Sequence, residues 1–245
     1  MKSKALISFY NSYHQKNGVY SKPITDGNFT YFYFIKYFKK HYKGTKSGCV
    51  LDIGCGVGSI SFYLASKGMD VVGIDVSTRA IELCKKVAKN IGLKNVSFKR
   101  KTLDDQLEKN DVVVCSEIIE HIKDDAEFAV MLGKKLKKNA YLFLSTPSKD
   151  NVFYPLGVFA KFDAEVGHLR RYTAESLTSV LEHHGFTIEA IYPIEGVLRN
   201  ILFTTKLGFI IRFIRGPLVP IFHAIDAVFI SLLGPCNYFV VARKK

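Results

Sequence analysis

Carboxylate and imidazole side chains gather in two stretches of the chain. Glu117, Glu120 and His121 lie within five residues, and His168 follows further along the chain. On a helix, spacings of three and four residues place Glu117, Glu120 and His121 on one face. Two carboxylates and two imidazoles can hold a divalent cation with open positions for substrate oxygens, or can remove a hydroxyl proton.

The same residues have structural explanations that remain open. Glutamates favour the first turn of a helix because of the helix dipole, and a histidine there can simply pack against a bound cofactor. Arg170 and Arg171 follow His168 after one leucine. They are expected either in a solvated loop or gripping a substrate phosphate or carboxylate.

A glycine turn is the most informative element for positioning this chemistry. The apolar strand 50–53 runs into Gly54, Gly56 and Gly58, and a helix is predicted to begin at Ser59. Glycines let the backbone approach a ligand closely, and the first turn of the helix offers amide N–H groups. The pattern is D-x-G-x-G-x-G, beginning at Asp52, and it differs from the dinucleotide spacing G-x-G-x-x-G.

A second parallel strand is predicted over 69–75, ending in Asp75. Asp75 lies 17 residues after Gly58, where a Rossmann-type site places the carboxylate that accepts ribose hydroxyls. Ser77 is expected to cap the next helix and Gly92 to end it. The apolar face predicted for that helix comprises Ala80, Ile81, Cys84, Val87, Ala88 and Ile91.

The strands alternate with helices along the chain, which predicts an α/β fold with a doubly wound, Rossmann-like sheet. We expect seven strands with an antiparallel last strand, a helical N-terminal cap and a helical insert before the last strand. The later strands are predicted at 96–98, 111–115, 141–144, 186–192 and 238–242. Ligands of such sheets bind at the carboxyl ends of the strands. The loops that carry Glu117 and His168 leave the fourth and fifth strands at that edge.

The residues from about Val50 to about Phe186 resemble class I S-adenosylmethionine-dependent methyltransferases, chiefly the ubiquinone-biosynthesis O-methyltransferase and methyltransferase type 11-12 group. The E-x-x-E-H order, a following S-T-P and a later histidine also resemble small-RNA 3′-end 2′-O-methyltransferases, where such residues hold a metal. The resemblance implies S-adenosylmethionine as cofactor. It implies cofactor contacts at Asp52, Gly54, Cys55, Gly56, Gly58, Asp75, Val76, Thr102, Leu103 and Ser116.

The resemblance implies catalytic roles for His121, His168 and Glu117. It implies a divalent cation, magnesium, zinc or manganese, on Glu117, Glu120, His121 and His168. Many members of the family carry an acid where Thr102 stands, so the backbone at Leu103 is the alternative contact for adenine.

One methyltransferase domain is predicted over 1–245. We divide it into a cap (1–47), a donor-binding core (48–194), an apolar basic insert (195–235) and a last strand (236–245). The cap is expected to cover the donor with aromatic side chains: Tyr10, Tyr13, Tyr31, Phe32, Tyr33 and Phe34. Five scattered cysteines and no apolar signal-like core favour a cytoplasmic setting, with peripheral membrane contact as an extension.

Basic charge is concentrated in both flanks. The net charge of +13 divides into +8 over residues 1–50 and +5 over residues 195–245. The insert is mostly apolar but carries Arg199, Lys206, Arg212 and Arg215, so two helices are expected rather than a membrane span. The insert is interpreted as a lid or a contact with an anionic membrane, with a buried hairpin or a dimer contact as the alternative.

The leading functional hypothesis is O-methylation of a small or lipophilic acceptor, such as a quinone precursor, a lipid-linked glycan or a phenol. The alternatives are an RNA 2′-O-methyltransferase and a non-catalytic, donor-binding partner subunit. The oily insert argues against nucleic acid, because nucleic-acid grooves pair charge with separated stacking aromatics. A dehydrogenase is disfavoured by the glycine spacing. The sequence does not fix the oligomeric state.

Overall fold

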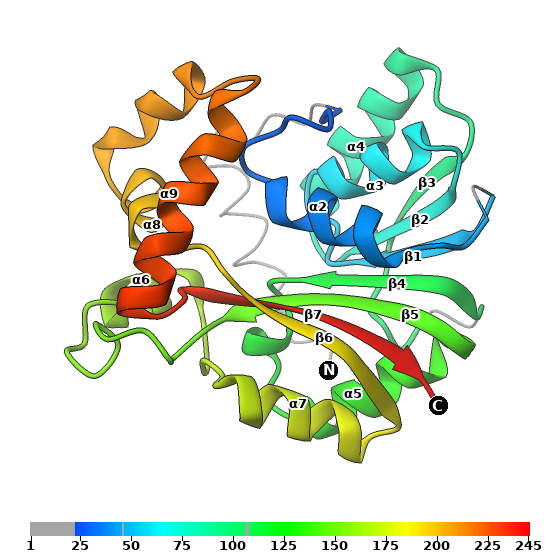
Figure 1. Ribbon diagram of the computed structural model, residues 1–245. Helices are drawn as coiled ribbons and strands as arrows, with labels where there is room; N and C mark the ends of the chain where they lie inside the picture. The colour runs from blue at the N-terminus through cyan, green and yellow to red at the C-terminus, as the bar shows by residue number, and fades with distance from the viewer. Residues whose placement is uncertain (1–22, 46, 106–107) are drawn as a thin grey trace.

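A seven-stranded mixed sheet forms the centre of the molecule in a computed structural model that describes residues 23–45, 47–105 and 108–245 (Figure 1). The strand order is β3-β2-β1-β4-β5-β7-β6. Strands β1 to β5 pair in parallel, whereas β7 is antiparallel to both β5 and β6. The predicted Rossmann-like sheet with an antiparallel last strand is confirmed.

The strands lie where the sequence predicts them, and several are longer. The sheet adds backbone pairs at strand ends whose side chains are polar, and these the hydrophobic pattern does not reveal. The strands are β1 (Cys49–Ile53), β2 (Asp70–Asp75), β3 (Val96–Arg100), β4 (Asn110–Ser116), β5 (Leu136–Pro147), β6 (Phe186–Ile194) and β7 (Asn237–Lys244).

Helices cover both faces of the sheet. Figure 1 shows α2 (Phe32–His41), α3 (Ser59–Ser66) and α4 (Thr78–Ile91) on one face, with α5 (Asp125–Lys134) and α7 (Ala174–His183) on the other. The first face packs aromatic residues of α2 onto the sheet, including Phe34 against Phe239 and Tyr37 stacked on Tyr192 at 3.7 Å between ring centroids. The second face packs Phe128 and Leu132 of α5 with leucines of α7.

The predicted boundaries of α4 are confirmed by its caps. The Ser77 hydroxyl accepts from the Ala80 amide at the start of α4, and Gly92 ends that helix at a φ of 70°. Thr173 forms a capping box with Ser176 at the start of α7. The predicted apolar face of α4 is wrong at its last position, because Ile91 is exposed. The apolar cluster around Cys84 includes Val87 and Ala88 but does not extend to Ile91.

The insert between β6 and β7 leaves the sheet at the carboxyl edge of the parallel strands. Asn237 at the start of β7 pairs with both Pro147 at the end of β5 and Ile194 at the end of β6. The insert contains α8 (Val197–Thr204), the 3₁₀ segment η2 (Lys206–Phe213) and α9 (Leu218–Leu233). The expected two helices are therefore two α-helices joined by a 3₁₀ stretch. Within the described part of the chain, no helix has the length and apolar character needed to cross a bilayer.

Buried polar groups attach the insert to the rest of the molecule. Asp226 of α9 accepts hydrogen bonds from the amides of Gly196 and Arg199 at 2.7 and 3.2 Å, which caps the N-terminus of α8. The Arg199 guanidinium bonds to Glu195 and to the carbonyl oxygens of Phe29 and Thr30. Arg199 is therefore a buried anchor, and its predicted role at a membrane surface is wrong.

We predict that Asp226→Ala destabilises the fold by about 1–3 kcal/mol, because two buried amides lose their acceptor. Urea unfolding followed by circular dichroism measures the change. Asp226→Asn retains an acceptor oxygen and should lose less. A loss no larger than that of the exposed control Ser231→Ala would contradict the anchoring role.

Candidate active site

The glycine turn brings the backbone of three residues to the carboxyl end of β1. Gly54, Gly56 and Gly58 adopt φ values of 64°, 50° and 77°, in the left-handed region that favours glycine. A Cβ at Gly58 would meet Cys84 Sγ and the Phe98 ring at 3.0 Å, so the turn is also packed too tightly for a side chain. Cys55 lies between these glycines, and its amide donates to the carbonyl oxygen of Ile74.

Two acids lie beside this turn. Asp75, at the end of β2, accepts from the Gly56 amide at 2.9 Å and the Ser77 amide at 2.7 Å. Asp52 in β1 accepts from the Ser61 hydroxyl at 2.5 Å, and burial raises the pKa of its carboxyl to about 7. Asp75 therefore ties the glycine turn to β2, while Asp52 ties β1 to α3.

The remaining predicted cofactor residues follow β2, β3 and β4 at the same edge. Val76 directly follows Asp75 and is half-buried, and Leu103 is buried. Thr102 donates its hydroxyl to Asp105 at 2.9 Å. Ser116 ends β4 and exchanges a hydrogen bond with Ser145 at the end of β5. These positions remain predictions for cofactor contact, gathered along one edge of the sheet.

The described part of the N-terminal cap reaches this edge through Tyr31. Burial raises the pKa of Tyr31. A hydrogen bond with Ser59 lowers this pKa, and the charge of Asp52 raises it. Tyr33 and Phe34 are buried against the sheet instead. Tyr10 and Tyr13 lie outside the described residues.

A carboxylate and two imidazoles converge beside the cofactor edge. Glu120, His121 and His168 offer ligand atoms that all lie within 4.8 Å of one another. Glu120 Oε1 is 3.8 Å from Nε2 of each histidine. Glu120 Oε1 is fully buried and has no hydrogen-bond partner, whereas Oε2 accepts from Thr146 at 3.0 Å.

Hydrogen bonds fix which ring nitrogens face Glu120. His121 Nδ1 lies 3.0 Å from the Gly167 carbonyl oxygen, and His168 Nδ1 lies 2.9 Å from Asp163 Oδ1. Burial raises the pKa of Asp163, but hydrogen bonds from His168 and Arg171 outweigh it and leave this pKa lowered. Both Nδ1 atoms therefore donate to acceptors, and both Nε2 atoms turn a lone pair toward Glu120.

Glu117 lies apart from this group, and the helix predicted over 117–121 is wrong. Only Ile119–His121 form a single 3₁₀ turn, while Glu117 adopts a φ of 56°. Its carboxylate accepts from Ser145 at 2.7 Å and from Asn237 at 3.2 Å. Burial raises its pKa to about 7, and the charge of Glu195 adds to that shift. Glu117 is thus held by β5 and β7, away from the ligand atoms of the three-residue group.

The two arginines after His168 support the protein rather than an exposed anion site. Arg171 is buried and binds Asp163 through two nitrogens at 2.7 and 2.8 Å. Arg170 pairs with Asp125 at 2.6 Å and donates to the Lys123 carbonyl oxygen. The interpretation of either arginine as a substrate grip is therefore wrong.

Two acids that shape the site carry no recognisable sequence signal. Asp163 holds both His168 and Arg171, although its spacing to each matches no motif. Glu195 adopts a φ of 55° directly after β6, and its charge raises the pKa of Glu117. Thr146, in contrast, belongs to the S-T-P sequence that ends β5.

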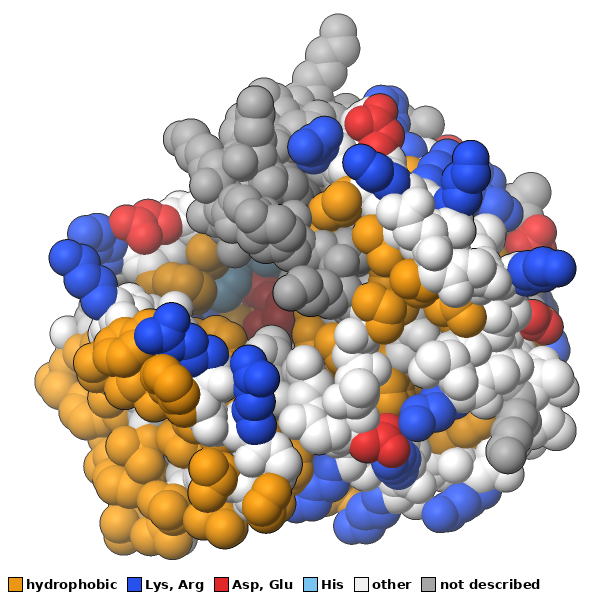
Figure 2. Space-filling model, turned by 90° about the horizontal axis from the view of Figure 1, so that it is seen from above, with side chains coloured by type: hydrophobic (Ala, Val, Ile, Leu, Met, Phe, Trp, Pro, Cys, Tyr) orange, Lys and Arg blue, Asp and Glu red, His pale blue; other side chains and the backbone are white. Residues whose placement is uncertain are grey.

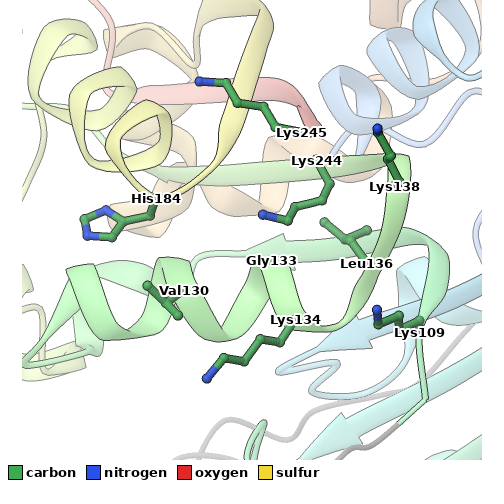
Figure 3. A pocket seen from close by; sticks show the side chains of 9 residues that line it. All are labelled: Lys109, Val130, Gly133, Lys134, Leu136, Lys138, His184, Lys244 and Lys245. Atoms are coloured by element: carbon green, nitrogen blue, oxygen red, sulfur yellow. The ribbon is translucent and has the colours of Figure 1, made fainter.

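A lysine-lined hollow of about 450 Å³ lies at the opposite edge of the sheet. Figure 3 shows Lys134, Lys138 and Lys244 around it, together with Val130 and His184. Leu136 begins β5 there and Lys244 ends β7, so the hollow is separated from the glycine turn by the length of the strands. It is not the candidate active site.

The fold agrees with comparisons to known proteins. A family described as a methyltransferase domain matches residues 33–191. A crystal structure of an S-adenosylmethionine-dependent methyltransferase from Mesorhizobium loti superposes with a TM-score of 0.62 at 15% identity, covering 86% of this chain and 97% of that one. Haemonchus contortus phosphoethanolamine N-methyltransferase 2, in complex with S-adenosyl-L-methionine, superposes with a TM-score of 0.63 at 18% identity, covering 86% and 51%. The chain belongs to the class I S-adenosylmethionine-dependent methyltransferases.

Curated relatives match about half of the chain. Ubiquinone biosynthesis O-methyltransferase of Rickettsia canadensis is 33% identical over 129 residues, which is 51% of this chain and 54% of the relative. The protein of the same name from Actinobacillus pleuropneumoniae is 32% identical over 130 residues, covering 50% and 55%. The chain thus spans about half the length of these relatives. S-adenosylmethionine is the cofactor of this family.

We predict that Asp75→Ala weakens S-adenosylmethionine binding by roughly 1.5–3 kcal/mol, the range for hydrogen bonds to a charged group. The loss combines the ribose contact with the freed Gly56 amide. Isothermal calorimetry measures it. Asp70→Ala, an exposed acid at the other end of β2, is the matched control. Equal affinities for the two variants would exclude Asp75 from the donor site.

Proposed function

We propose that the chain transfers the methyl group of S-adenosylmethionine to a hydroxyl oxygen of a small or lipophilic acceptor, such as a phenol, a quinone precursor or a lipid-linked glycan. The observation that supports this best is the buried Glu120 carboxylate facing the Nε2 atoms of His121 and His168. A hydroxyl is a poor nucleophile until its proton leaves, and such a group provides bases for that proton. The relatives named as ubiquinone biosynthesis O-methyltransferases support oxygen as the accepting atom.

The three-residue group also fits a divalent cation. Glu120 Oε1 is buried without a hydrogen-bond donor, and two imidazole lone pairs face it at 3.8 Å. Separations of this size allow ligand bonds of about 2.1 Å from each atom to one ion. Asp163 and Gly167 accept from the outer Nδ1 atoms, as partners of metal-binding histidines commonly do. Glu120, His121 and His168 would hold the ion, which would lower the pKa of an acceptor hydroxyl.

The charges of the group agree with a cation at this place. Burial and the neighbouring Glu117 raise the pKa of Glu120 well above its usual value. Burial lowers the pKa of His121, so its ring is neutral near pH 7. A cation must displace a proton from Glu120 and none from His121. Its apparent affinity therefore rises with pH until Glu120 is ionised without the cation.

Glu117 is assigned a separate role beside the methyl group. Its backbone conformation is one that costs of order 1–3 kcal/mol, and Ser145 and Asn237 hold the carboxylate in place. Strained residues that the surroundings hold so firmly cluster at functional sites. We assign Glu117 to orient the acceptor hydroxyl or to balance the positive sulfonium of the donor.

An RNA acceptor fits less well. Arg170 and Arg171, the arginines nearest to His168, are paired with Asp125 and Asp163 and do not offer phosphate contacts. Aliphatic side chains outnumber aromatic ones among the exposed apolar residues of the insert, whereas grooves for nucleic acid pair charge with separated stacking aromatics. The intact base residues also argue against a purely structural, donor-binding subunit.

We predict that His168→Ala and Glu120→Gln each lower the rate of methyl transfer by about 100-fold or more, the usual span of general acid–base effects. Single-turnover assays with labelled donor measure the rate. His183→Ala, an exposed histidine of α7, is the matched control. Donor affinity should stay within twofold of the wild-type value, which separates this loss from misfolding.

Cation binding has its own test. We expect calorimetry with manganese or zinc ions to show one site, release of protons, and weaker binding as the pH falls. Glu120→Gln and His168→Ala should remove the site. If the wild-type chain binds no cation while His168→Ala still abolishes transfer, His121 and His168 act as bases without a metal.

The acceptor class is tested by incubating the chain with labelled donor and fractionated membrane lipids, soluble phenols or RNA. Mass spectrometry of the product after acid and base hydrolysis identifies the methylated atom. An ether or ester methyl group on a lipid or phenol is expected. A stable N-methyl or C-methyl product would overturn oxygen as the acceptor.

A further inference from the structure

Helix α9 has its polar residues inside and its apolar residues outside. Val219, His223 and Asp226 are its buried residues, and His223 stacks on Phe32 at 4.1 Å between ring centroids. The large residues of its outer face are 50–70% exposed: Leu218, Ile221, Ile225, Val228 and Leu232. An ordinary surface helix shows the reverse arrangement, with its apolar stripe facing the core.

Neighbouring segments extend this apolar face. In α8 and η2 the exposed large residues are Ile201, Phe203, Leu207, Phe209 and Phe213. A loop before α6 (Ala160–Val166) adds Val152, Tyr154, Leu156 and Val158, and the stretch 152–158 contains no charged residue. The loop joins the end of α9 through a hydrogen bond from the Val152 amide to the Leu233 carbonyl oxygen at 2.9 Å. Figure 2 shows apolar side chains gathered widely over the insert.

The exposed charges of the insert all have one sign. The insert over 195–235 has six charged residues, and Glu195, Arg199 and Asp226 are turned inward into hydrogen bonds. The other three, Lys206, Arg212 and Arg215, are exposed. Arg212 lies over the rings of Phe209 and Phe213, so a cation accompanies exposed aromatic residues.

We propose that the outer faces of α8, η2 and α9, with the loop 152–158, form a docking surface for an anionic lipid bilayer. Apolar side chains enter the interface of the bilayer, and the three basic residues meet acidic headgroups. A second copy of the chain fits less well, because a twofold contact through the insert would bring its three cations together, and the insert has no exposed acid to pair them. An exposed apolar face of this extent marks an interaction site.

The surface borders the candidate active site on two sides. The loop 152–158 leads into α6, which carries Asp163 and continues to His168. The insert begins at Glu195 and Arg199, whose ion pair lies beside Glu117. A docked chain would therefore present its site to molecules dissolved in the bilayer. This consequence rests on the proposed lipophilic acceptor, whereas the docking itself does not.

Flotation with vesicles tests the docking without any methyl transfer. We expect the chain to float with vesicles of equal parts phosphatidylglycerol and phosphatidylcholine at low salt, and less with pure phosphatidylcholine or at high salt. Ile221→Ser/Ile225→Ser/Val228→Ser should weaken binding about tenfold or more, because half-exposed aliphatic side chains no longer enter the lipid. Arg212→Gln/Arg215→Gln should weaken it about 25-fold, near fivefold for each lost charge.

Matched controls come from the opposite edge of the sheet. Val130→Ser removes an exposed aliphatic residue of α5, and Lys134→Gln/Lys138→Gln removes two charges from the lysine-lined hollow. Both should bind vesicles as the wild type does, and all variants should keep the wild-type melting temperature and donor affinity. Lack of wild-type flotation at low salt would overturn the proposal, as would loss of binding only in the lysine variant. Sedimentation that shifts from dimer to monomer in the α9 variant, without a change in flotation, would assign the face to a second copy.

Discussion

The position of β7 between β5 and β6 is the constraint on which the other features of the molecule depend. Because β7 is antiparallel to both neighbours, the chain must travel from the end of β6 to the start of β7 at the same edge. That edge is where β1, β2 and β4 deliver the glycine turn, Asp75 and Glu117. An insert at this connection therefore lies beside the cofactor edge whatever its sequence. The apolar composition of the insert then determines what environment the site meets.

Buried charge is arranged differently around the two glutamates of the site. Glu117 receives hydrogen bonds from Ser145 and Asn237, so its raised pKa results from incomplete compensation of burial. Glu120 receives one bond on Oε2 and none on Oε1, where two imidazole nitrogens face it. A buried carboxylate oxygen without a donor is costly unless a proton or a cation occupies the space before it. Glu117 is therefore held in position by its hydrogen bonds, whereas Glu120 has an oxygen that can bind a proton or a cation.

The sequence predicts the elements of this fold well because each strand and helix carries its own local signal. Ser77, Gly92 and Thr173 mark helix ends by capping chemistry that acts within a few residues. The same locality explains the helix wrongly predicted after β4. Its glutamates have helical spacing, but the tertiary hydrogen bonds of Ser145 and Asn237 hold Glu117 in a left-handed conformation. No pattern near Glu117 reports partners that are 28 and 120 residues away along the chain.

The sequence predicts the types of residue in the candidate site better than it predicts which residues they bond to. The three-residue group of Glu120, His121 and His168 brings together residues that the strand topology already assigns to one edge. Asp163, which fixes the tautomer of His168, is absent from any motif because its role depends on the path of α6. Arg199 shows the opposite case, since its charge suggested a surface contact and its burial beside Glu195 shows an anchor. The sequence gives the sign of the charge at a position. The burial of the side chain determines whether its partner is another residue of the chain or a molecule outside it.

The inverted arrangement of α9 follows from what its inner face must do. The N-terminus of α8 leaves backbone amides that need acceptors, and Asp226 supplies them from α9. His223 fills the space against the aromatic residues of α2, and burial beside Arg199 lowers its pKa to about 3, so it stacks as a neutral ring. The hydrogen bonds of Asp226 and the ring stacking of His223 therefore hold the inner face of α9. Because the inner face no longer depends on aliphatic residues, the isoleucine, valine and leucine side chains of α9 are available to an outer partner, and the basic residues beside them favour an acidic one.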